Sequence, residues 1–477
     1  MKKSWFYPHK NVILRDFILI NMERALYRSL LDWKNSPERK PLMLYGARQV
    51  GKTYLLKEFG QREFKNVVYV NCYKNSAAQT LFGGYPDTDR LIQGLSILSG
   101  ESITPGETFV FLDEAQEIPA VVSSLKYFCE NSRELHVAVA GSLLGVLNIK
   151  GESFPVGKVD ILRLYPLSFE EFLSATGESQ LVTILSEGDW SMAEVFEDRL
   201  SERLRQYYFV GGMPEAVVNF VSGHHATEIR KVQTNILTAY EADISKHTGS
   251  LTQRVRMIWD SVPSQLAKEN KKFIYGAIRK GARAKEYETA IQWLVDAGLV
   301  YKLERTRDAK SPLKFYADPN AFKLFLLDIG LLGALVGSSP AQALIGNNIF
   351  TEYKGAFTEN YVMQQLASLP DTPAYYFSKD NSSVEVDFVV QLPDRIVPIE
   401  VKAEENVRSK SFSSFINGDF ASYHLKGLRL SMKGFKDQGW MENVPLYAAR
   451  SFINRLRALP PGAVNSKNDL QGDALAK

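Results

Sequence analysis

The chain has 477 residues, which is too many for one hydrophobic core, so we expect about three domains. Its formal net charge is only +3, so any surface that binds nucleic acid must be a local one. The chain has two cysteines, which argues against a disulfide framework. It has no apolar run near the roughly 20 residues of a membrane span and no signal-peptide pattern, which argues against a membrane protein. We therefore expect a cytoplasmic protein.

The first residues have no regular pattern, and we expect residues 1–22 to form an irregular arm. Helical spacing then appears from Met22 to Trp33, where Leu26 and Leu30 can share one face.

A glycine-rich loop follows the apolar run Leu42–Tyr45 and precedes Tyr54–Phe59, which has helical character. The order strand, loop, helix is the context that the G-x-x-x-x-G-K-[ST] pattern requires, although a chance glycine turn before a helix is the simpler alternative. The residues that we expect to bind a nucleotide are Gly46, Ala47, Arg48, Gln49, Val50, Gly51, Lys52, Thr53 and Tyr54.

The residue types of this loop match what phosphate binding requires. Two glycines let the backbone wrap a phosphate chain at φ angles that a Cβ would resist. The loop N–H groups and the positive helix end then face the phosphates. Lys52 can reach the β- and γ-phosphates, and the Thr53 hydroxyl can ligate Mg²⁺. We therefore expect ATP and Mg²⁺ as ligands.

Two acids end the next buried strand pattern, Thr108–Leu112. They lie at the carboxyl edge of the sheet, where the glycine loop also lies. Asp113 is the candidate that orders Mg²⁺, and Glu114 is the candidate base that aligns the attacking water. A solvated acidic turn is the alternative.

Two further strands are predicted at residues 135–142 and 159–165. Ser142 ends the first strand and could bond the γ-phosphate or the water, or else serve as a helix N-cap or turn serine. Ser168 and Glu171 form a capping-box pattern, so a helix should begin there. Strands that alternate with helices over residues 40–180 predict a parallel α/β sheet.

The segments GARQVGKT, FLDEAQEIP, AVAGSLLG and LRLYPLSFEEFL resemble a large prokaryotic family of AAA-type P-loop ATPases with a C-terminal nuclease-like domain of uncharacterised role. Residues 208–216 and 240–244 also resemble this family, and the resemblance covers roughly residues 20–450.

The resemblance implies working roles for Lys52, for Asp113 and Glu114, and for a sensor at Ser142. An arginine finger is usual in this class. Arg163 is a candidate for it, and Lys158 stands where the family often has arginine.

Helix formers dominate residues 182–249, which we expect to form a lid over the nucleotide, broken at Gly211-Gly212 by a hinge or a plain helix break. Residues 250–318 have the order helix, helix, hairpin of a winged helix, with strands at Leu299–Glu304 and Leu313–Tyr316. A basic run accompanies them: Lys268, Lys271, Lys272, Arg279, Lys280, Arg283 and Lys285. Such a module contacts DNA, or it is a protein-contacting domain with a solvated basic face.

The C-terminal part has a helix pattern at Phe357–Leu366, which contains Glu359. A strand pattern with Asp387 and a second strand at Ile396–Ala403 follow it across a Pro-Asp turn. This order predicts a helix packed beside a hairpin.

Glu400 and Lys402 are two residues apart in the second strand, so their side chains share one face. A hairpin would bring them to Asp387, and Glu359 could close the cluster. The three carboxylates can ligate Mg²⁺, and the lysine can orient water or stabilise charge on a phosphate. The pattern resembles the PD-(D/E)xK nucleases, although an E-x-K pair on a strand is often only a surface charge pair.

These patterns predict an α/β protein in which a P-loop sheet and a helical lid precede a winged-helix-like domain and a restriction-endonuclease-like domain. The expected segments are an arm (1–22), an AAA-type domain (23–181), a lid (182–249), a winged-helix-like domain (250–318), a nuclease-like domain (319–457) and a disordered tail (458–477).

The expected function is an Mg²⁺-dependent ATPase coupled to a nucleic-acid-binding or nuclease-like domain. A nucleotide-gated DNA- or protein-binding regulator with an inactive nuclease fold is the alternative. The expected partners are ATP, and DNA or another nucleic acid, with self-assembly or a protein partner left open and no membrane.

Overall fold

The structure, a computed structural model, describes residues 22–84, 87–141, 154–268, 272–338, 354–379, 384–403 and 410–459. Its contacts divide the chain into two units, which are described separately. The N-terminal unit comprises Glu23–Tyr165 with Gln292–Leu299. The C-terminal unit comprises Pro166–Ile291 and the chain from Val300 onward.

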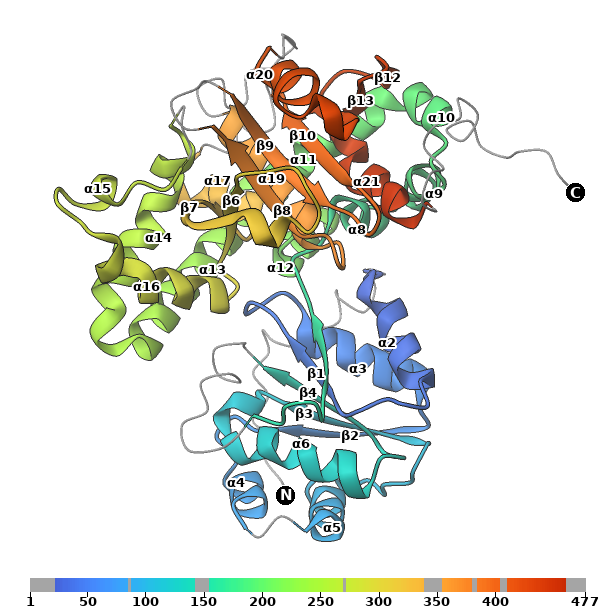
Figure 1. The fold of residues 1–477 in the computed structure, drawn as a ribbon. Helices are drawn as coiled ribbons and strands as arrows, with labels where there is room; N and C mark the ends of the chain where they lie inside the picture. Colours follow the sequence, from blue (N-terminus) through green and yellow to red (C-terminus); the bar gives the residue numbers. More distant parts are fainter. Residues whose placement is uncertain are drawn as a thin grey trace, which may run out of the picture. The chain divides into compact units, whose positions relative to one another are not determined.

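A five-stranded sheet forms the centre of the N-terminal unit (Figure 1). Its strands are β1 (Leu42–Tyr45), β2 (Asn66–Asn71), β3 (Thr108–Asp113), β4 (His136–Gly141) and β5 (Asp160–Arg163). They lie in the order β2-β3-β4-β1-β5, and every neighbouring pair is parallel. The predicted parallel α/β sheet is confirmed, with β3 buried along its whole length.

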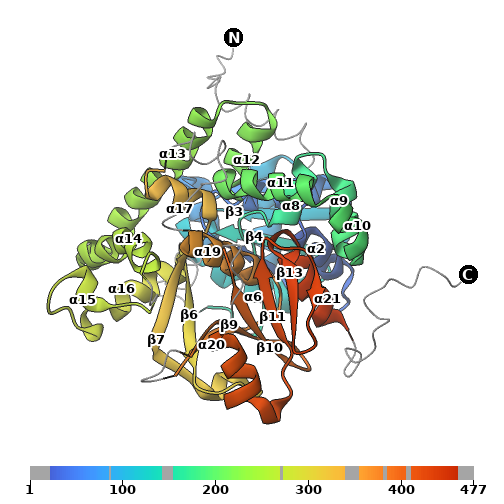
Figure 2. The ribbon, with the colours of Figure 1, turned by 90° about the horizontal axis from the view of Figure 1, so that it is seen from above.

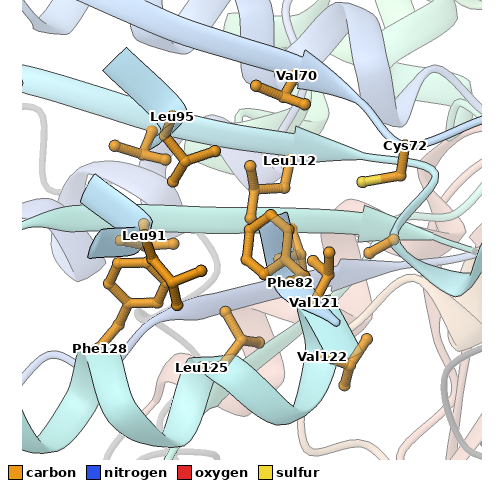
Figure 3. Close-up of a cluster of buried hydrophobic side chains, with 14 of the residues drawn as sticks. Val70, Cys72, Phe82, Leu91, Leu95, Leu112, Val121, Val122, Leu125 and Phe128 are labelled. Carbon is orange, nitrogen blue, oxygen red and sulfur yellow. The ribbon is translucent and has the colours of Figure 1, made fainter. Parts of the chain in front are cut away.

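Helices cover both faces of this sheet because its strands alternate two apolar sets of side chains. The helices are α2 (Leu26–Asn35), α3 (Lys52–Glu63), α4 (Ser76–Phe82), α5 (Thr88–Ser99) and α6 (Pro119–Asn131). On one face, Val70 and Leu112 point toward Phe82, Leu95 and Phe128 of α4, α5 and α6 (Figure 3).

The opposite face is aromatic. The Phe109 ring lies 5.6 Å from the ring of Phe59 in α3 and 6.4 Å from that of Trp33 in α2. The helix that was expected from Met22 begins about one turn later, at Leu26.

The C-terminal unit begins with a helical region. Its helices are α8 (Phe169–Ala175), α9 (Ser179–Glu187), α10 (Trp190–Val195), α11 (Glu197–Val210), α12 (Pro214–Val221), α13 (Ala226–His247), α14 (Thr252–Leu266), α15 (Tyr275–Ile278) and α16 (Ala284–Asp296), whose last residues belong to the other unit. The capping box predicted at Ser168 is confirmed, since Ser168 accepts from the Glu171 amide and the Glu171 carboxylate from the Ser168 amide.

The Gly211-Gly212 break between α11 and α12 is held in place by its neighbours. The Gly212 N–H donates to Asp328 Oδ2 at 2.6 Å, and its carbonyl accepts from the Leu167 N–H at 2.7 Å. A Cβ on Gly212 would lie 2.1 Å from the Leu167 oxygen, so only glycine fits. The break is therefore a fixed joint within this unit.

An eight-stranded mixed sheet completes the C-terminal unit, in the order β12-β13-β11-β10-β9-β8-β6-β7. Its strands are β6 (Val300–Thr306), β7 (Ala317–Leu326), β8 (Ala374–Ser378), β9 (Glu385–Gln391), β10 (Ile396–Val401), β11 (Gly427–Ser431), β12 (Lys436–Asp437) and β13 (Met441–Pro445). The helices beside it include α17 (Ile329–Leu335), α19 (Lys354–Ala367), α20 (Lys410–Ser414) and α21 (Ala449–Ala458). α19 contacts β7 and β10 (Figure 2).

The strand pair of the expected winged helix differs from the prediction. Residues Leu313–Tyr316 form a 3₁₀ turn, and the strand that pairs with β6 begins at Ala317. β6 also pairs with β8, so the hairpin belongs to the eight-stranded sheet. Asp318 stabilises this polar strand start, because its carboxylate lies 2.6 Å from Arg305 and 3.1 Å from Arg307.

The expected arm and tail lie almost wholly outside the described residues, as does Lys271 of the basic run. No helix in the described part of the chain has the length and apolar character needed to cross a membrane.

Candidate functional site

The glycine loop joins β1 to α3 and has the backbone that its sequence requires. A Cβ on Gly46 would lie 2.3 Å from the Leu164 oxygen, and Gly51 has a φ of 98° as the N-cap of α3. Ala47 and Val50 are buried and anchor the loop, whereas Arg48 and Gln49 are exposed. The loop is thus fixed at two points between its glycines.

Lys52 begins α3 and folds back over the loop. Its Nζ donates to the carbonyls of Gly46 at 3.0 Å and Ala47 at 2.8 Å. Burial lowers the pKa of Lys52 to about 8, although attraction to Glu114 and Asp113 opposes this effect. The ammonium is held by neutral acceptors, which it can exchange for phosphate oxygens.

Thr53 and Asp113 lie in contact although 60 residues separate them. The Thr53 hydroxyl donates to Asp113 Oδ2 at 2.9 Å, and Tyr69 of β2 donates to the same oxygen at 3.2 Å. Burial raises the pKa of Asp113, and the hydrogen bond from Thr53 opposes this rise. Sequence reasoning missed Tyr69, whose position in β2 carries no motif.

Glu114 follows β3 with a φ of 52°, a left-handed conformation that turns the chain sharply. Its N–H donates to Asp113 Oδ1 at 3.0 Å, and its carboxylate accepts a short hydrogen bond from the Gln116 amide. Sequence reasoning also missed Gln116. The nearby strand β4 ends at Gly141, and Ser142 lies outside the described residues.

A buried arginine braces the glycine loop from outside the motif. Arg24 is 8% exposed and donates to the carbonyls of Val50 at 3.0 Å and Tyr165 at 2.6 Å. It therefore ties the loop to the segment after β5. In the sequence it is one of several charged residues within a helix pattern, which predicts no partner.

The two cations considered for an arginine finger lie inside this unit. Arg163 pairs with Tyr45 through β5 and β1, and its guanidinium lies 4.8 Å from the Tyr165 ring centre. Arg163 is therefore next to the loop of its own chain. Lys158 lies 3.0 Å from Glu130.

The residues around Thr53 fit a magnesium ion. A hydroxyl that donates its proton to Asp113 still has oxygen lone pairs for a cation. Mg²⁺ commonly binds one or two protein oxygens and takes its other ligands from phosphates and water. This site needs no larger cluster, and the described residues contain no group of three or more His, Cys, Asp or Glu side chains that could hold a metal ion.

The C-terminal cluster lies on the hairpin of β9 and β10 (Figure 1). Phe388 pairs with Ile399, so the next position sets Asp387 opposite Glu400. The Val401 N–H donates to Asp387 Oδ2 at 2.8 Å, and Lys402 Nζ lies 2.8 Å from Glu400 Oε1. The structure thus brings three of the four candidate residues together.

Glu400 is 6% exposed, and its Oε2 atom is buried. Among the described residues this oxygen has no hydrogen-bond partner. A buried carboxylate oxygen without a donor is costly, and a cation would satisfy it.

Glu359 of α19 faces a lysine. Its Oε2 lies 3.9 Å from Lys323 Nζ, and that ammonium also lies 2.8 Å from Glu385 Oε1. Lys323 of β7 is 1% exposed. Sequence reasoning missed it, although a lysine inside the apolar run Phe322–Leu327 was a signal.

Comparison with protein families identifies three segments of the chain. Residues 38–173 match the family described as AAA domain, so the chain carries an AAA-type domain. Residues 201–342 and 354–447 match two families described as domains of unknown function, DUF8612 and DUF4143. A search of curated proteins finds no match.

Several solved structures are similar at low sequence identity. A Walker-type ATPase of Pyrococcus abyssi is 15% identical, with 66% of this chain and 96% of that chain covered and a TM-score of 0.41. The Orc1 protein of Aeropyrum pernix, solved in complex with DNA, is 15% identical over 70% of this chain and 94% of its own, with a TM-score of 0.26. Cdc6 of Pyrobaculum aerophilum is 13% identical over 72% and 96%, with a TM-score of 0.24.

Proposed function

Starting from an AAA domain at residues 38–173, we propose that this chain hydrolyses ATP to ADP and phosphate in an Mg²⁺-dependent reaction. The hydrogen bond of 2.9 Å between Thr53 and Asp113 carries the proposal, because it joins the glycine loop to the acid-tipped strand. Lys52 lies in the same loop, and Glu114 is the residue after Asp113. These are the groups that a P-loop ATPase needs.

The chemical step follows from these positions. Lys52 exchanges its two carbonyl partners for phosphate oxygens and stabilises the charge that develops on them. Water attacks the γ-phosphorus, its new P–O bond replaces the bond to the β–γ bridging oxygen, and Glu114 takes the proton. Thr53 and Asp113 would hold Mg²⁺, which supplies positive charge to the β- and γ-phosphates.

Gln116 is a positioning residue in this scheme. Its amide already donates to the Glu114 carboxylate, so it fixes the direction in which Glu114 can accept. The left-handed backbone at Glu114 adds to this constraint.

The test is ATP turnover by the full chain with Lys52→Ala. We expect no turnover above background, whereas Lys126→Ala, which removes an exposed lysine of α6, should keep the wild-type rate. Wild-type turnover by the Lys52→Ala variant would refute the proposal.

A second proposed function concerns the C-terminal unit. The orphaned oxygen of Glu400 favours a divalent ion there, with Asp387 and Glu400 as ligands and Lys402 directed at a phosphodiester. Nuclease activity on DNA or RNA is the corresponding reaction. The alternative is that the hairpin only binds nucleic acid or a protein.

The basic segment supports a nucleic-acid partner for this unit. Four of its cations are exposed: Arg279, Lys280, Arg283 and Lys285. Arg279 has a carboxylate neighbour, Glu286, at 3.8 Å. Cations on one short stretch can neutralise phosphates, which makes binding depend on salt.

Incubation with plasmid, single-stranded DNA and RNA in Mg²⁺ or Mn²⁺ separates the alternatives. Cleavage that Asp387→Ala and Lys402→Ala abolish, and that Lys436→Ala on exposed β12 leaves unchanged, supports the nuclease. Salt-sensitive binding without cleavage supports a nucleotide-gated binding module.

A further inference from the structure

We propose that the Lys323 ammonium is the resident cation of Glu359 and Glu385, and that Glu359 therefore binds no divalent ion. The carboxylates of the C-terminal cluster then divide into Glu359 and Glu385, which contact Lys323, and Asp387 and Glu400, which can take one ion. This inference refines the second proposed function, and its test distinguishes the failure of either one.

The Lys323 ammonium contacts side chains of three other elements. It belongs to β7, where it pairs with Leu303 of β6. Its ammonium lies 4.9 Å from the centre of the Tyr376 ring on β8 and then meets Glu385 on β9 at 2.8 Å. The ammonium thus lies among side chains that come from β8, β9 and α19.

The position of Lys323 excludes the usual role of a lysine at a nuclease site. With 1% of its surface exposed, the side chain cannot touch a phosphodiester that arrives from solvent. Glu359 is buried as well, at 4% exposure, so the two charges compensate each other inside the protein. A divalent ion on Glu359 would lie near a fixed positive charge and be repelled.

Lys323 also attracts Asp387, but the lysine that contacts Glu400 is Lys402, which is 30% exposed and can turn away from an arriving ion. Asp387 is tied to the Val401 amide through one oxygen, and Glu400 meets Lys402 through one oxygen. Glu400 Oε2 and Glu359 Oε2 are both buried without a hydrogen bond among the described residues, but Glu359 Oε2 lies 3.9 Å from the buried ammonium of Lys323. This pair has the oxygen chemistry for one hard cation.

Replacing Lys323 should give one result if the lysine only stabilises the fold, and another if it occupies the place of a metal ion. If Lys323 were merely structural, its removal would destabilise the sheet and create no metal site. If it stands in place of a metal, its removal leaves carboxylates that a metal can bridge.

The test is Mn²⁺ binding to the nucleotide-free full chain, measured by electron paramagnetic resonance. Every protein carries Thr53→Ala, so that the glycine loop contributes no ion. We expect Glu359→Gln alone to leave the Mn²⁺ affinity within about twofold. Lys323→Met should add one bound Mn²⁺ ion per chain. In the double variant Lys323→Met with Glu359→Gln, the affinity for this additional ion should be about tenfold weaker or more. Lys302→Met on the neighbouring strand β6 is the matched control and should add none.

Two results would overturn the inference: a tenfold weaker affinity in Glu359→Gln while Lys323 is present, or a folded Lys323→Met protein without an additional ion. The Glu359→Gln arm decides the question even where Lys323→Met does not fold. Asp387→Asn tests the pair of Asp387 and Glu400 separately. Loss of the Mn²⁺ ion in this variant concerns only the proposed nuclease site and not the inference about Lys323.

Discussion

The two candidate sites each set a lysine among carboxylates, yet the two lysines are held in opposite ways. Lys52 donates to two loop carbonyls, and burial lowers its pKa to about 8. Burial also acts to lower the pKa of Lys323, but attraction to Glu359 and Glu385 raises it above its usual range.

The difference shows how the surroundings of a lysine assign its use. The two neutral carbonyls stabilise the Lys52 ammonium only weakly. The oxygens of an incoming phosphate can therefore replace them, and their negative charge raises the pKa of Lys52 again. Carboxylates have already neutralised Lys323, so an arriving anion gains little from it. The Lys52 ammonium is therefore available to bind a phosphate, whereas the Lys323 ammonium is already paired with carboxylates.

The largest effect is expected at the N-terminal site with Glu114→Gln. We expect kcat to fall about 10²–10⁴-fold, because the proposed base is lost, while bound ATP persists on Lys52 and Thr53. Phosphate release and retention of labelled ATP measure the two parts. Glu117→Gln, at an exposed neighbouring acid, is the control. Unchanged turnover in Glu114→Gln would remove Glu114 from this role.

The two lysines of the C-terminal cluster should differ in stability. Lys323→Met leaves buried Glu359 uncompensated and should cost about 3–5 kcal/mol of unfolding free energy. Lys402→Met removes a partner that is 30% exposed, and Glu400 keeps its attraction to Arg429, so the change should cost about 0–1 kcal/mol. Urea denaturation with hydrogen exchange of the β9 amides measures both. Equal losses would contradict the contrast drawn above.

Arg24→Ala tests the brace behind the glycine loop. Loss of a charged donor to two carbonyls should cost about 1.5–3 kcal/mol of stability in the N-terminal unit and raise KM for ATP. Thermal unfolding and steady-state kinetics give the values, with exposed Arg90→Ala as the control. A variant with normal stability and KM would show that the loop holds its shape alone.

The smallest effect is expected in the pH dependence of ATP affinity. Below pH 8 the Lys52 ammonium is already formed, whereas above it a proton must be taken up when ATP binds. Affinity should therefore fall with rising pH above about 8, by up to roughly tenfold per unit. Calorimetry between pH 7 and 9.5 measures the slope, which Lys52→Arg should abolish. A flat wild-type profile would contradict the lowered pKa.

Local patterns were sufficient to predict strands β1, β3, β4 and β5 of the parallel sheet, the glycine loop and the capping box at Ser168. Each depends on residues within a few positions, such as the apolar run that makes β3 and ends at Asp113. The pairing of β9 with β10 also followed from a short turn between two strand patterns.

Contacts across long stretches of chain could not be predicted. Arg24 meets a carbonyl 141 residues away, and Lys323 meets Glu385 across 62 residues. The strand start at Ala317 was missed because its polar residues look like a turn. Arg305 and Arg307 supply the charges that make Asp318 stable there.

The fixed joint at Gly212 has a mechanical consequence. Pro166 opens the C-terminal unit, and the very next residue is already bonded to Gly212, which Asp328 anchors two positions beyond the end of β7. Within the C-terminal unit, a displacement of Leu167 would therefore be transmitted through Gly212 to Asp328, next to the end of the strand that carries Lys323.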